Sequence, residues 1–240
     1  MTRQIIRLTG EDRVDFLQGL VTNDVRRAPC WAAILTPQGK YLADFLILPA
    51  PDALLIDVDA RLSDDLMRRL SMYKLRARVT LEPVDMPVAR GTGAAPEGAI
   101  PDPRHPALGW RLYGQAGDDG SDWDAIRVTH LIPETLTELI PNETYILEAG
   151  FERLHGVDFR KGCYVGQEVT ARMKHKTELR KGLTRLAITG TAPLGTPITH
   201  DSREVGTLYT QAGGHALAHV RFDRVAPGMQ AAEARLDPAP

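Results

Sequence analysis

The chain has very little cysteine. Only Cys30 and Cys163 carry a thiol among its 240 residues, and they lie far apart in the sequence. Two cysteines are too few for a disulfide framework or for the paired Cys-x-x-Cys ligands of a structural zinc site. We therefore expect a protein of a reducing compartment, without a structural disulfide and without a metal site.

Long apolar runs are also missing. No stretch of the sequence approaches the roughly 20 apolar residues that a membrane helix needs. The N-terminal segment, Met1–Leu8, contains two arginines and is too short and too charged for a signal peptide. The sequence therefore predicts a cytoplasmic protein with no membrane partner.

Several motifs that define large classes of enzymes are absent. The sequence contains no G-x-x-x-x-G-K-[ST] phosphate loop, no G-x-G-x-x-G after a predicted strand and no H-E-x-x-H. The nucleotide-binding, Rossmann and zinc-protease classes thus have no support. The net charge is −2, so the chain as a whole is no polyanion binder, and we do not expect nucleic acid among its partners.

The hydrophobic pattern of the first half predicts an α+β protein with antiparallel sheets. Apolar residues that alternate or run together between turns predict strands at 3–8, 31–36, 41–48, 53–58 and 76–82. Apolar residues at helical spacing predict helices at 9–21 and 60–74. The segment 91–106 holds three glycines and four prolines, which is typical of a linker between two subdomains.

The texture changes after residue 178. Short predicted strands at 182–189, 197–199, 204–209 and 215–222 are separated by glycine, proline, aspartate and serine. This pattern indicates a small C-terminal β-barrel. We therefore predict one α+β region over 1–178 and a barrel over 179–240, with a frayed end at 237–240.

One segment, Lys161–Arg172, gathers more reactive residue types than any other. Cys163 lies there between Gly162 and Gly166, with basic residues on both sides. Nearby cations raise the thiolate fraction of a cysteine, and glycine lets the backbone approach a ligand closely. We therefore predict that Cys163 is functional, whereas Cys30, which leads into a strand, is predicted to be a packed thiol.

The residues around this cysteine leave alternatives open. Gln167 and Glu168 open a predicted helix through Met173, where Glu168 either complements the helix dipole or contacts a ligand. The segment 160–185 carries eight Lys or Arg against two Glu, either as a solvated face or to attract an anion. A catalytic thiol would need a base, and His155 and His175 are the candidates by sequence distance.

Two further carboxylates stand out by their position. Glu148 lies between an apolar run and small residues, in Leu147-Glu148-Ala149-Gly150. A carboxylate can accept two donors from one planar heterocycle, although an exposed glutamate is the simpler interpretation. Asp44 lies within an apolar strand, and it either faces solvent or lines a cleft.

The octapeptide Lys161-Gly162-Cys163-Tyr164-Val165-Gly166-Gln167-Glu168 resembles the signature of the YgfZ-type folate-binding proteins. These proteins are relatives of the aminomethyltransferase (T-protein) of the glycine cleavage system and include mitochondrial iron–sulfur assembly factors. The segments Thr9–Val25 and Leu35–Lys40 are similar to the N-terminal region of the same family. The resemblance covers most of the chain and is most specific at the cysteine.

This resemblance implies subdomains arranged around a central folate-binding cavity, tetrahydrofolate or a one-carbon derivative as ligand, and a role in iron–sulfur protein assembly or repair. Partners would be iron–sulfur assembly proteins or client enzymes. Cys163 would be the functional thiol and Glu148 would hold the pterin. The implied cofactor-binding residues are Glu148, Lys161, Gly162, Tyr164, Gln167, Glu168 and Arg172.

One departure from the T-protein pattern bears on the activity. T-proteins carry an acidic pair after the turn that corresponds to Gly39-Lys40, where this chain has Ala43-Asp44. Loss of a participating carboxylate typically costs orders of magnitude in rate, which argues against ordinary aminomethyl transfer. A folate-dependent one-carbon transferase, a tRNA-binding or tRNA-modification-linked factor and a Cys-His hydrolase remain the alternatives, and whether the protein is an enzyme is open.

Overall fold

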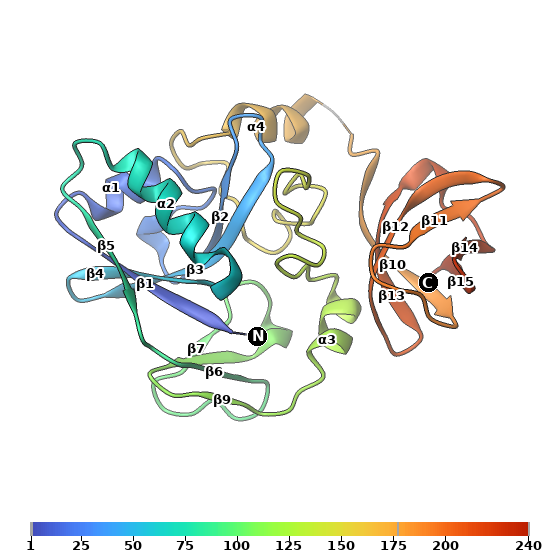
Figure 1. The fold of residues 1–240 in the computed structure, drawn as a ribbon, viewed down its shortest axis with the longest axis horizontal. Coiled ribbons are helices and arrows are strands. Elements are labelled where there is room, and N and C mark those ends of the chain that lie inside the picture. The colour runs from blue at the N-terminus through green and yellow to red at the C-terminus, as the bar shows by residue number, and fades with distance from the viewer. Residues whose placement is uncertain (1, 177, 240) are drawn as a thin grey trace. The chain divides into compact units, whose positions relative to one another are not determined.

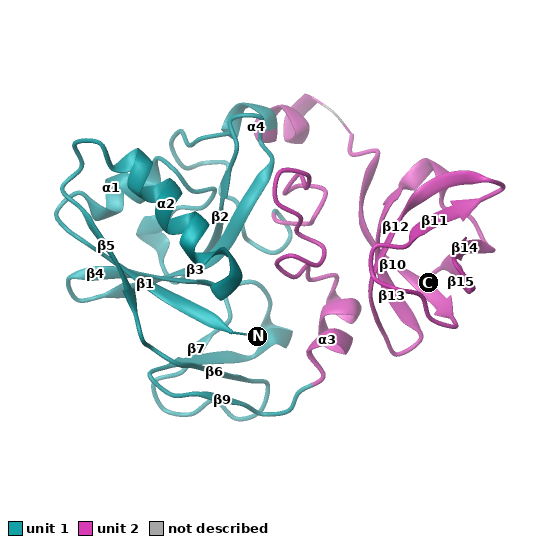
Figure 2. Cartoon of the chain, viewed as in Figure 1, with its two compact units in different colours: residues 1–121, 152–169 teal, residues 122–151, 170–240 magenta. Residues whose placement is uncertain are grey.

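The computed structural model describes residues 2–176 and 178–239 and divides into two compact units (Figure 2). The first unit is Met1–Ser121 with Glu152–Val169, and the second is Asp122–Phe151 with Thr170–Pro240. The cut passes through one helix, α4 (Gln167–Lys176). The predicted division of the chain after residue 178 stays a prediction.

The first unit is built on a five-stranded antiparallel sheet with the strand order β2-β3-β4-β1-β5 (Figure 1). Its strands are β1 (Arg3–Thr9), β2 (Cys30–Leu35), β3 (Tyr41–Ala50), β4 (Ala53–Asp59) and β5 (Thr80–Val84). Two helices, α1 (Arg13–Gln18) and α2 (Ser63–Lys74), and the 3-10 turns η1 (Val25–Arg27) and η2 (Ala60–Leu62) connect them.

The core of this unit lies between the sheet and the two helices. Leu17 of α1 and Leu66 and Leu70 of α2 are almost fully buried against strand residues such as Phe45 and Ile56. Leu66 and Leu70 are four residues apart and therefore share one face of the helix. Helical periodicity predicts Leu62, Leu66, Leu70 and Tyr73 on one face; Leu66 and Leu70 are buried as expected, whereas Tyr73 is 45% exposed.

The helix predicted from Thr9 begins only at Arg13. Gly10 has φ +106°, and a Cβ there would lie 2.0 Å from the carbonyl oxygen of Arg78. A positive φ interrupts a right-handed helix, and only glycine fits this close approach. The expected strand at 76–82 likewise begins later, at Thr80.

A smaller four-stranded sheet, in the order β7-β8-β6-β9, completes the first unit. Its strands are β6 (Val88–Gly91), β7 (Ile100–Pro101), β8 (Trp110–Tyr113) and β9 (Gly117–Asp118), with η3 (Pro106–Leu108) before β8. Part of the segment 91–106 thus forms a strand. The same segment also contains the buried ion pair of Asp102 and Arg104, which are 5% and 8% exposed.

Charged side chains tie the two sheets together. Asp57 of β4 is fully buried and accepts hydrogen bonds from Arg3 Nε at 2.6 Å and from the Tyr113 hydroxyl at 2.8 Å. Arg111 of β8 spans Asp57 and Asp102, at 3.3 and 3.0 Å. Buried charges are tolerated only when each is paired and hydrogen-bonded, as these are.

The second unit ends in a closed six-stranded barrel in the order β10-β13-β12-β11-β14-β15. Its strands are β10 (Lys181–Thr189), β11 (Pro197–His200), β12 (Arg203–Ala212), β13 (His215–Arg221), β14 (Met229–Ala231) and β15 (Ala234–Pro238), with η4 (Phe222–Arg224). Fully buried Ile198, Leu208 and Val220 belong to its core. The α+β class and the C-terminal barrel are thereby confirmed.

The prediction of a frayed end at 237–240 is wrong for the described residues. Asp237 and Pro238 belong to β15 and pair with Ala187 and Leu186 of β10. The Asp237 carboxylate also accepts the backbone N–H of Gly228 at 2.7 Å. A terminal segment is ordered when strand pairing holds it, whatever its proline content. Pro240 lies outside the described residues.

The second unit also contains α3 (Trp123–His130), whose Arg127 is buried. Its guanidinium contacts Glu138 at 2.9 Å and the Thr210 hydroxyl of β12 at 2.8 Å. Burial lowers and the charges of Glu138 and Glu134 raise the pKa of Arg127, which ends above its ordinary value. Among the described residues, no helix is both long and apolar enough to cross a membrane.

Candidate functional site

Cys163 lies in an exposed loop that leads into α4. Gly162 before it is also exposed, and a Cβ on Gly162 would meet no atom within 4 Å. The predicted helix after the loop is confirmed and extends to Lys176. The thiol is therefore accessible from outside the unit.

Lys161 anchors this loop through its ammonium group. Its side chain is buried, and Nζ donates to the carbonyl oxygens of Gln18 and Val21, at 2.6 and 2.5 Å, at the end of α1. Nζ also lies 4.9 Å from the centroid of the Tyr164 ring, a cation–π distance. Burial lowers the pKa of Lys161 to about 8.

Two glycines bring the loop onto the turn between β2 and β3. Gly166 has φ +83°, and a Cβ there would lie 2.6 Å from the carbonyl oxygen of Thr36. Gly39 has φ +76°, and its Cβ would lie 2.9 Å from the Cβ of Val169. Neither position can take a side chain without movement of backbone. The loop that carries Cys163 is therefore pinned before and after the cysteine.

Cys30 is a packed thiol, as predicted. It is 6% exposed at the start of β2, and Sγ lies 3.8 Å from the carbonyl oxygen of Asp24. Burial, and secondarily the charge of Asp24, raise the pKa of the Cys30 thiol to about 12. Since the thiolate is the nucleophile and the metal ligand, Cys30 is chemically quiet near neutral pH. Of the two thiols, only that of Cys163 is exposed.

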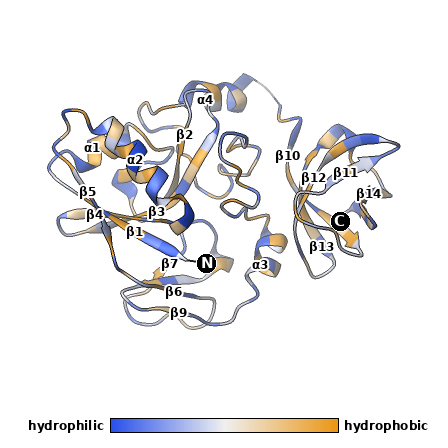
Figure 3. Ribbon diagram, viewed as in Figure 1, coloured by the Kyte–Doolittle hydropathy of each residue, from blue (hydrophilic) through white to orange (hydrophobic). Residues whose placement is uncertain are grey.

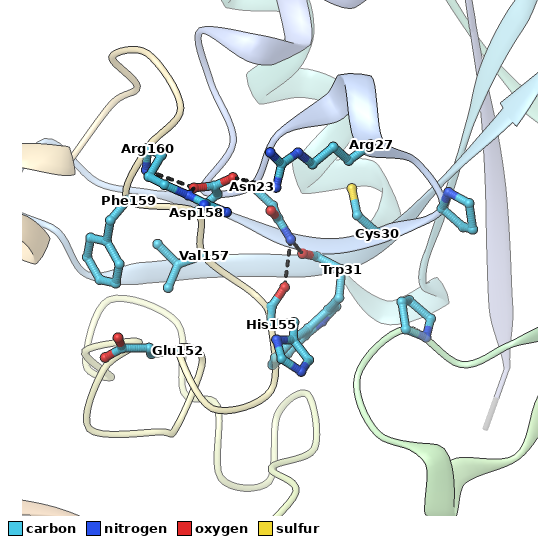
Figure 4. A pocket seen from close by; sticks show the side chains of 12 residues that line it. Asn23, Arg27, Cys30, Trp31, Glu152, His155, Val157, Asp158, Phe159 and Arg160 are labelled. Atoms are coloured by element: carbon cyan, nitrogen blue, oxygen red, sulfur yellow. Dashed lines mark hydrogen bonds and ion pairs between the residues drawn. The ribbon is translucent and has the colours of Figure 1, made fainter.

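An open cavity of about 490 Å³, here called the Cys30 cavity, lies within the first unit (Figure 4). Ligand pockets in proteins commonly have 300–1,000 Å³. The chain segments 23–31 and 152–160 supply most of its wall. The lining includes Asn23, Arg27, Cys30, Trp31, His155 and Arg160.

Hydrogen bonds to the N-terminal segment hold the wall formed by 152–160. The Asn23 amide donates to the carbonyl oxygens of Trp31 at 2.7 Å and of His155 at 2.6 Å (Figure 4). The Thr22 hydroxyl donates to the carbonyl oxygen of Gly156 at 2.7 Å. His155 has φ +57°, a conformation that non-glycine residues adopt rarely. The wall is thus fixed by contacts more than 130 residues apart in sequence.

The charged rim of this cavity is loosely paired. Arg27 lies 3.4 Å from Asp158, and Arg160 lies 3.7 Å from the same carboxylate. The two arginine side chains are 60% and 80% exposed. Exposed ion pairs of this kind contribute about 0–1 kcal/mol. Arg27 also lies 3.6 Å from Asp24, and either guanidinium can exchange these exposed contacts for a ligand carboxylate at little cost.

Glu148 belongs to the second unit and already has partners there. Its Oε2 lies 2.9 Å from His219 Nε2 on β13 and 4.0 Å from Lys181 Nζ on β10. Its carbonyl oxygen accepts the backbone N–H of Leu183 at 2.7 Å. The carboxylate is thus held in one orientation by two basic side chains of the barrel. Its assignment to the pterin stays a prediction.

The other predicted site residues are spread over the loop and helix. Tyr164 is buried beside Lys161, Gln167 is half-buried at the start of α4, and Glu168 and Arg172 are exposed on that helix. Of these residues, Lys161 and Tyr164 are in side-chain contact, through the cation–π pair described above. Their roles toward a cofactor remain predictions.

Asp44 is internally satisfied. It is 5% exposed and accepts hydrogen bonds from Trp31 Nε1 at 2.9 Å and from the Tyr41 hydroxyl at 2.7 Å. Its neighbour Ala43 is also buried, at 3% exposed, in the core of the first unit. Asp44 therefore neither faces solvent nor stands ready as a free base.

Neither histidine predicted as a base is shown to serve Cys163. His155 lines the Cys30 cavity, while His175 lies in the last turn of α4. The hydrolase alternative gains no support from these positions. Among the described residues, no group of three or more His, Cys, Asp or Glu side chains is arranged to hold a metal ion.

The Cys30 cavity has no counterpart among the features predicted from the sequence. Its wall comes from segments that are distant in sequence, and the side chains that form it carry no motif of their own. One signal was available: Asn23 lies in the N-terminal segment similar to the YgfZ-type proteins, and a side-chain amide there needs partners. Which backbone oxygens it meets is decided by the tertiary fold.

Comparison with curated proteins finds relatives that span nearly the whole chain. The chain is 32% identical to the mouse protein named "Iron-sulfur cluster assembly factor IBA57, mitochondrial", over 93% of this chain and 76% of that protein. The human protein of the same name is 30% identical with the same coverage. A Mycosarcoma maydis homolog is 31% identical over 96% of this chain. The chain spans 66% of the length of that fungal protein.

Two further comparisons concern the fold. Residues 180–240 match the C-terminal β-barrel domain described for CAF17. The crystal structure of the glycine cleavage system aminomethyltransferase T from Bartonella henselae superposes with a TM-score of 0.71. It covers 98% of this chain and 81% of the other, at 10% sequence identity. At that identity the likeness establishes the fold alone.

The predicted cytoplasmic location needs correction. The relatives named above are all designated mitochondrial proteins, which conflicts with it. The prediction rested on the lack of a signal peptide and of a long apolar run. Neither feature distinguishes between the compartments inside a cell.

Proposed function

Because the chain belongs to the IBA57 family of iron–sulfur cluster assembly factors, we propose that it binds tetrahydrofolate and uses the Cys163 thiol in the assembly or repair of iron–sulfur proteins. The observation that carries this proposal is the contrast between the two cysteines. Cys163 is exposed on a loop pinned by Lys161 and Gly166, whereas Cys30 is buried with a raised pKa.

The thiol count limits what Cys163 can do alone. Iron–sulfur clusters commonly take four cysteine ligands, and this chain offers one accessible thiol. Cys163 would therefore complete a cluster site together with thiols of a partner protein or of a second copy of the chain. The cluster is cargo in this proposal and not a resident group.

The Cys30 cavity is the site we favour for tetrahydrofolate. Its volume of about 490 Å³ suits a ligand of that size class. The exposed guanidinium groups of Arg27 and Arg160 match the carboxylates of a folate's glutamate tail, which accept paired N–H donors. The residues present therefore fit such a ligand.

The YgfZ-type assignment and the role of Glu148 belong to the same proposal. Its carboxylate is held by His219 at 2.9 Å and can still accept a further donor, because each carboxylate has two oxygens. A pterin at Glu148 would have to share it with that histidine. We retain Glu148 as the proposed pterin contact and test it separately from the cavity.

The first experiment is calorimetric titration of the full chain with tetrahydrofolate under anaerobic conditions. We expect binding by the wild type, weaker binding by Arg27→Ala and by Glu148→Gln, and unchanged binding by the control Arg13→Ala, an arginine outside the cavity. Absence of binding to the wild type would refute the folate part. Unchanged affinity in Glu148→Gln would refute only the pterin assignment.

The second experiment tests the thiol. Cells lacking this protein are complemented with Cys163→Ser or with Cys30→Ala, and the activity of an iron–sulfur enzyme is measured. We expect Cys163→Ser to fail and Cys30→Ala to restore activity, since Cys30 is buried and protonated near neutral pH. Full rescue by Cys163→Ser would refute the proposed use of the thiol.

A one-carbon transferase remains the alternative, and it has a direct assay. A transferase would convert tetrahydrofolate and formaldehyde or an aminomethyl donor to methylene-tetrahydrofolate. Ala43 is buried among apolar residues where T-proteins carry a participating acid, so we expect no useful rate. A rate abolished by a cavity variant such as Arg27→Ala would overturn this expectation.

A further inference from the structure

The end of α2 exposes a cluster of large apolar side chains. Met72, Tyr73 and Leu75 are 62%, 45% and 89% exposed. They are three of the five large hydrophobic residues that are exposed in the described part of the chain. Such a concentration within four positions is unusual for surface residues scattered singly and marks an interaction site.

Leu75 is also unfavourable in its backbone. It caps α2 with φ +40° and ψ −103°, outside the regions that leucine normally adopts. Residues in such conformations are strained and cluster at functional positions. Neither packing nor local conformation of the folded chain accounts for a leucine here.

An apolar groove lies beside this cluster, here called the Val165 groove. It has a volume of about 160 Å³ within the first unit. Its lining includes Leu20, Ile34, Leu42, Leu70, Tyr73 and Val165. Met72 and Arg69 also line it, so the groove and the exposed end of α2 form one surface. The alternation of hydrophilic and hydrophobic residues along α2 can be followed in Figure 3.

The rim of this surface is basic. Between Leu66 and Val79 the sequence carries five basic residues and no acidic residue. Arg68 and Arg69 share the single carboxylate of Asp65, and Arg78 pairs with Glu11 and Asp12. The positive balance of the rim therefore comes from Lys74 and Arg76. Arg76 is exposed and makes no ion pair or hydrogen bond within the part of the chain that the structure describes.

We propose that the Val165 groove and the exposed end of α2 dock an acidic segment of a partner protein, which inserts an apolar side chain into the groove. The positive rim selects acidic residues by charge complementarity. Tyrosine, methionine and arginine, the residue types gathered here, are those enriched at protein–protein interfaces. A few such residues supply most of the binding energy of an interface.

The shape favours a protein partner over a lipid surface. A peripheral membrane site buries protruding apolar side chains in the headgroup region. Here Met72 and Tyr73 border a concave groove with apolar walls, which suits insertion of a side chain. A membrane would leave the floor of that groove unfilled.

This surface also lies next to the proposed functional thiol. Val165 lines the groove, and Cys163 is two residues before it, so their Cα atoms lie within about 7.6 Å of one another. A segment docked in the groove therefore presents its neighbouring residues to Cys163. Only this last step rests on the proposed function; docking itself does not.

The test uses the full chain and a short fluorescein-labelled peptide with a Leu-Phe pair flanked by glutamates and aspartates. Binding is followed by fluorescence anisotropy. We expect saturable binding that weakens tenfold or more in Leu75→Ser and Met72→Ser. The control Leu194→Ser removes another exposed leucine, 61% exposed in the second unit, and is expected to leave the affinity unchanged. Circular dichroism and tetrahydrofolate titration of the same variants show that the fold and any ligand site are intact.

Charge is tested with Arg76→Glu and with a peptide whose acidic residues are replaced by lysine. We expect Arg76→Glu to weaken binding of the acidic peptide at least threefold at low salt, and we expect the lysine peptide not to bind. No binding of the acidic peptide to the wild type up to about millimolar concentration overturns the proposal, as does equal binding of both peptides. If neither the wild type nor any variant binds tetrahydrofolate while the peptide still binds, only the folate proposal is refuted.

Sedimentation with lipid vesicles tests whether a membrane, rather than a protein, binds this surface. Full-chain protein is sedimented with phosphatidylserine vesicles, with Leu75→Ser as the variant. We expect no difference between the two proteins. Sedimentation that Leu75→Ser abolishes, while peptide binding is insensitive to that change, would assign the surface to membranes and overturn the proposal.

Discussion

Asp102 is the best position at which to test the buried charge cluster of the first unit. Its carboxylate accepts hydrogen bonds from Arg104 Nε and Nη2 at 2.9 and 2.8 Å and from Arg111 Nε at 3.0 Å. Both arginines are buried, at 8% and 5% exposed. The substitution Asp102→Asn keeps the shape of the side chain but removes the negative charge that compensates the two buried guanidinium groups.

The expected cost follows from that burial. Removing one partner of a buried ion pair typically costs about 3–5 kcal/mol, because the remaining charge is left uncompensated. Arg111 retains Asp57 at 3.3 Å, so we expect the lower half of that range, about 3–4 kcal/mol. With a urea m-value near 3 kcal/mol/M, the unfolding midpoint would fall by about 1 M.

The control is Asp118→Asn on the four-stranded sheet of the first unit. Asp118 pairs with Arg90 at 2.8 Å, but its side chain is 43% exposed. A surface pair of this kind contributes about 0–1 kcal/mol, so this variant should unfold close to the wild type. If the two variants differ by less than about 0.5 kcal/mol in urea unfolding, the reasoning from burial is refuted.

The same cluster predicts the acid limit of stability. Burial raises the pKa of Asp102, but the charges of Arg104 and Arg111 outweigh it and hold the pKa below its ordinary value of 3.8. A carboxyl with a depressed native pKa contributes stability that is present above about pH 4 and is lost as the pH falls towards the native pKa. Urea unfolding of Asp102→Asn should therefore show a weaker pH dependence below pH 4 than the wild type, and identical slopes would contradict this assignment.

Three further predictions concern the cysteine loop. Lys161→Met should lower the free energy of unfolding, measured in urea, by about 2–4 kcal/mol, since two carbonyls lose a charged donor. The native pKa of Lys161, about 8, lies 2.5 below the ordinary 10.5, so the wild type should gain about 3 kcal/mol of stability over this variant as the pH rises from 8 to 10.5. Absence of this gain would contradict the burial argument. Gly166→Ala should cost about 2 kcal/mol or more and the control Gly162→Ala about 0.5 or less, and equal unfolding curves would refute the close approach at Gly166. Iodoacetamide should modify Cys163 and spare Cys30 in the native protein by mass spectrometry, and the reverse pattern would contradict the assigned burial.

Local patterns predicted the elements of the fold well. The hairpin predicted at 31–36 and 41–48 is β2 and β3, because its strands are apolar runs on either side of a Pro/Gly turn. The strand predicted at 53–58 is β4, and the helix predicted at 60–74 contains α2. These features depend on interactions between residues that are close in sequence, which a pattern in the sequence records directly.

Contacts between distant segments account for the failures. The strands β14 and β15 are short, and β15 is held by pairing with β10 and β14, so the sequence showed only a proline-containing end. Lys161 looked like a cation beside the thiol, yet its Nζ donates to Gln18 and Val21, some 140 residues earlier. A basic side chain near a cysteine in sequence need not lie near it electrostatically.

The sequence by itself determined the α+β class and the C-terminal barrel, and it singled out the loop around Cys163 as the candidate site. It did so because hydrophobic periodicity and a run of unusual residue types are local properties. Only the tertiary structure decided that the Cys30 cavity exists, that Glu148 pairs with His219, and that an apolar groove adjoins the cysteine loop. Each of these depends on backbone oxygens and side chains brought together across long stretches of chain, where the free energy of packing overrides local preference.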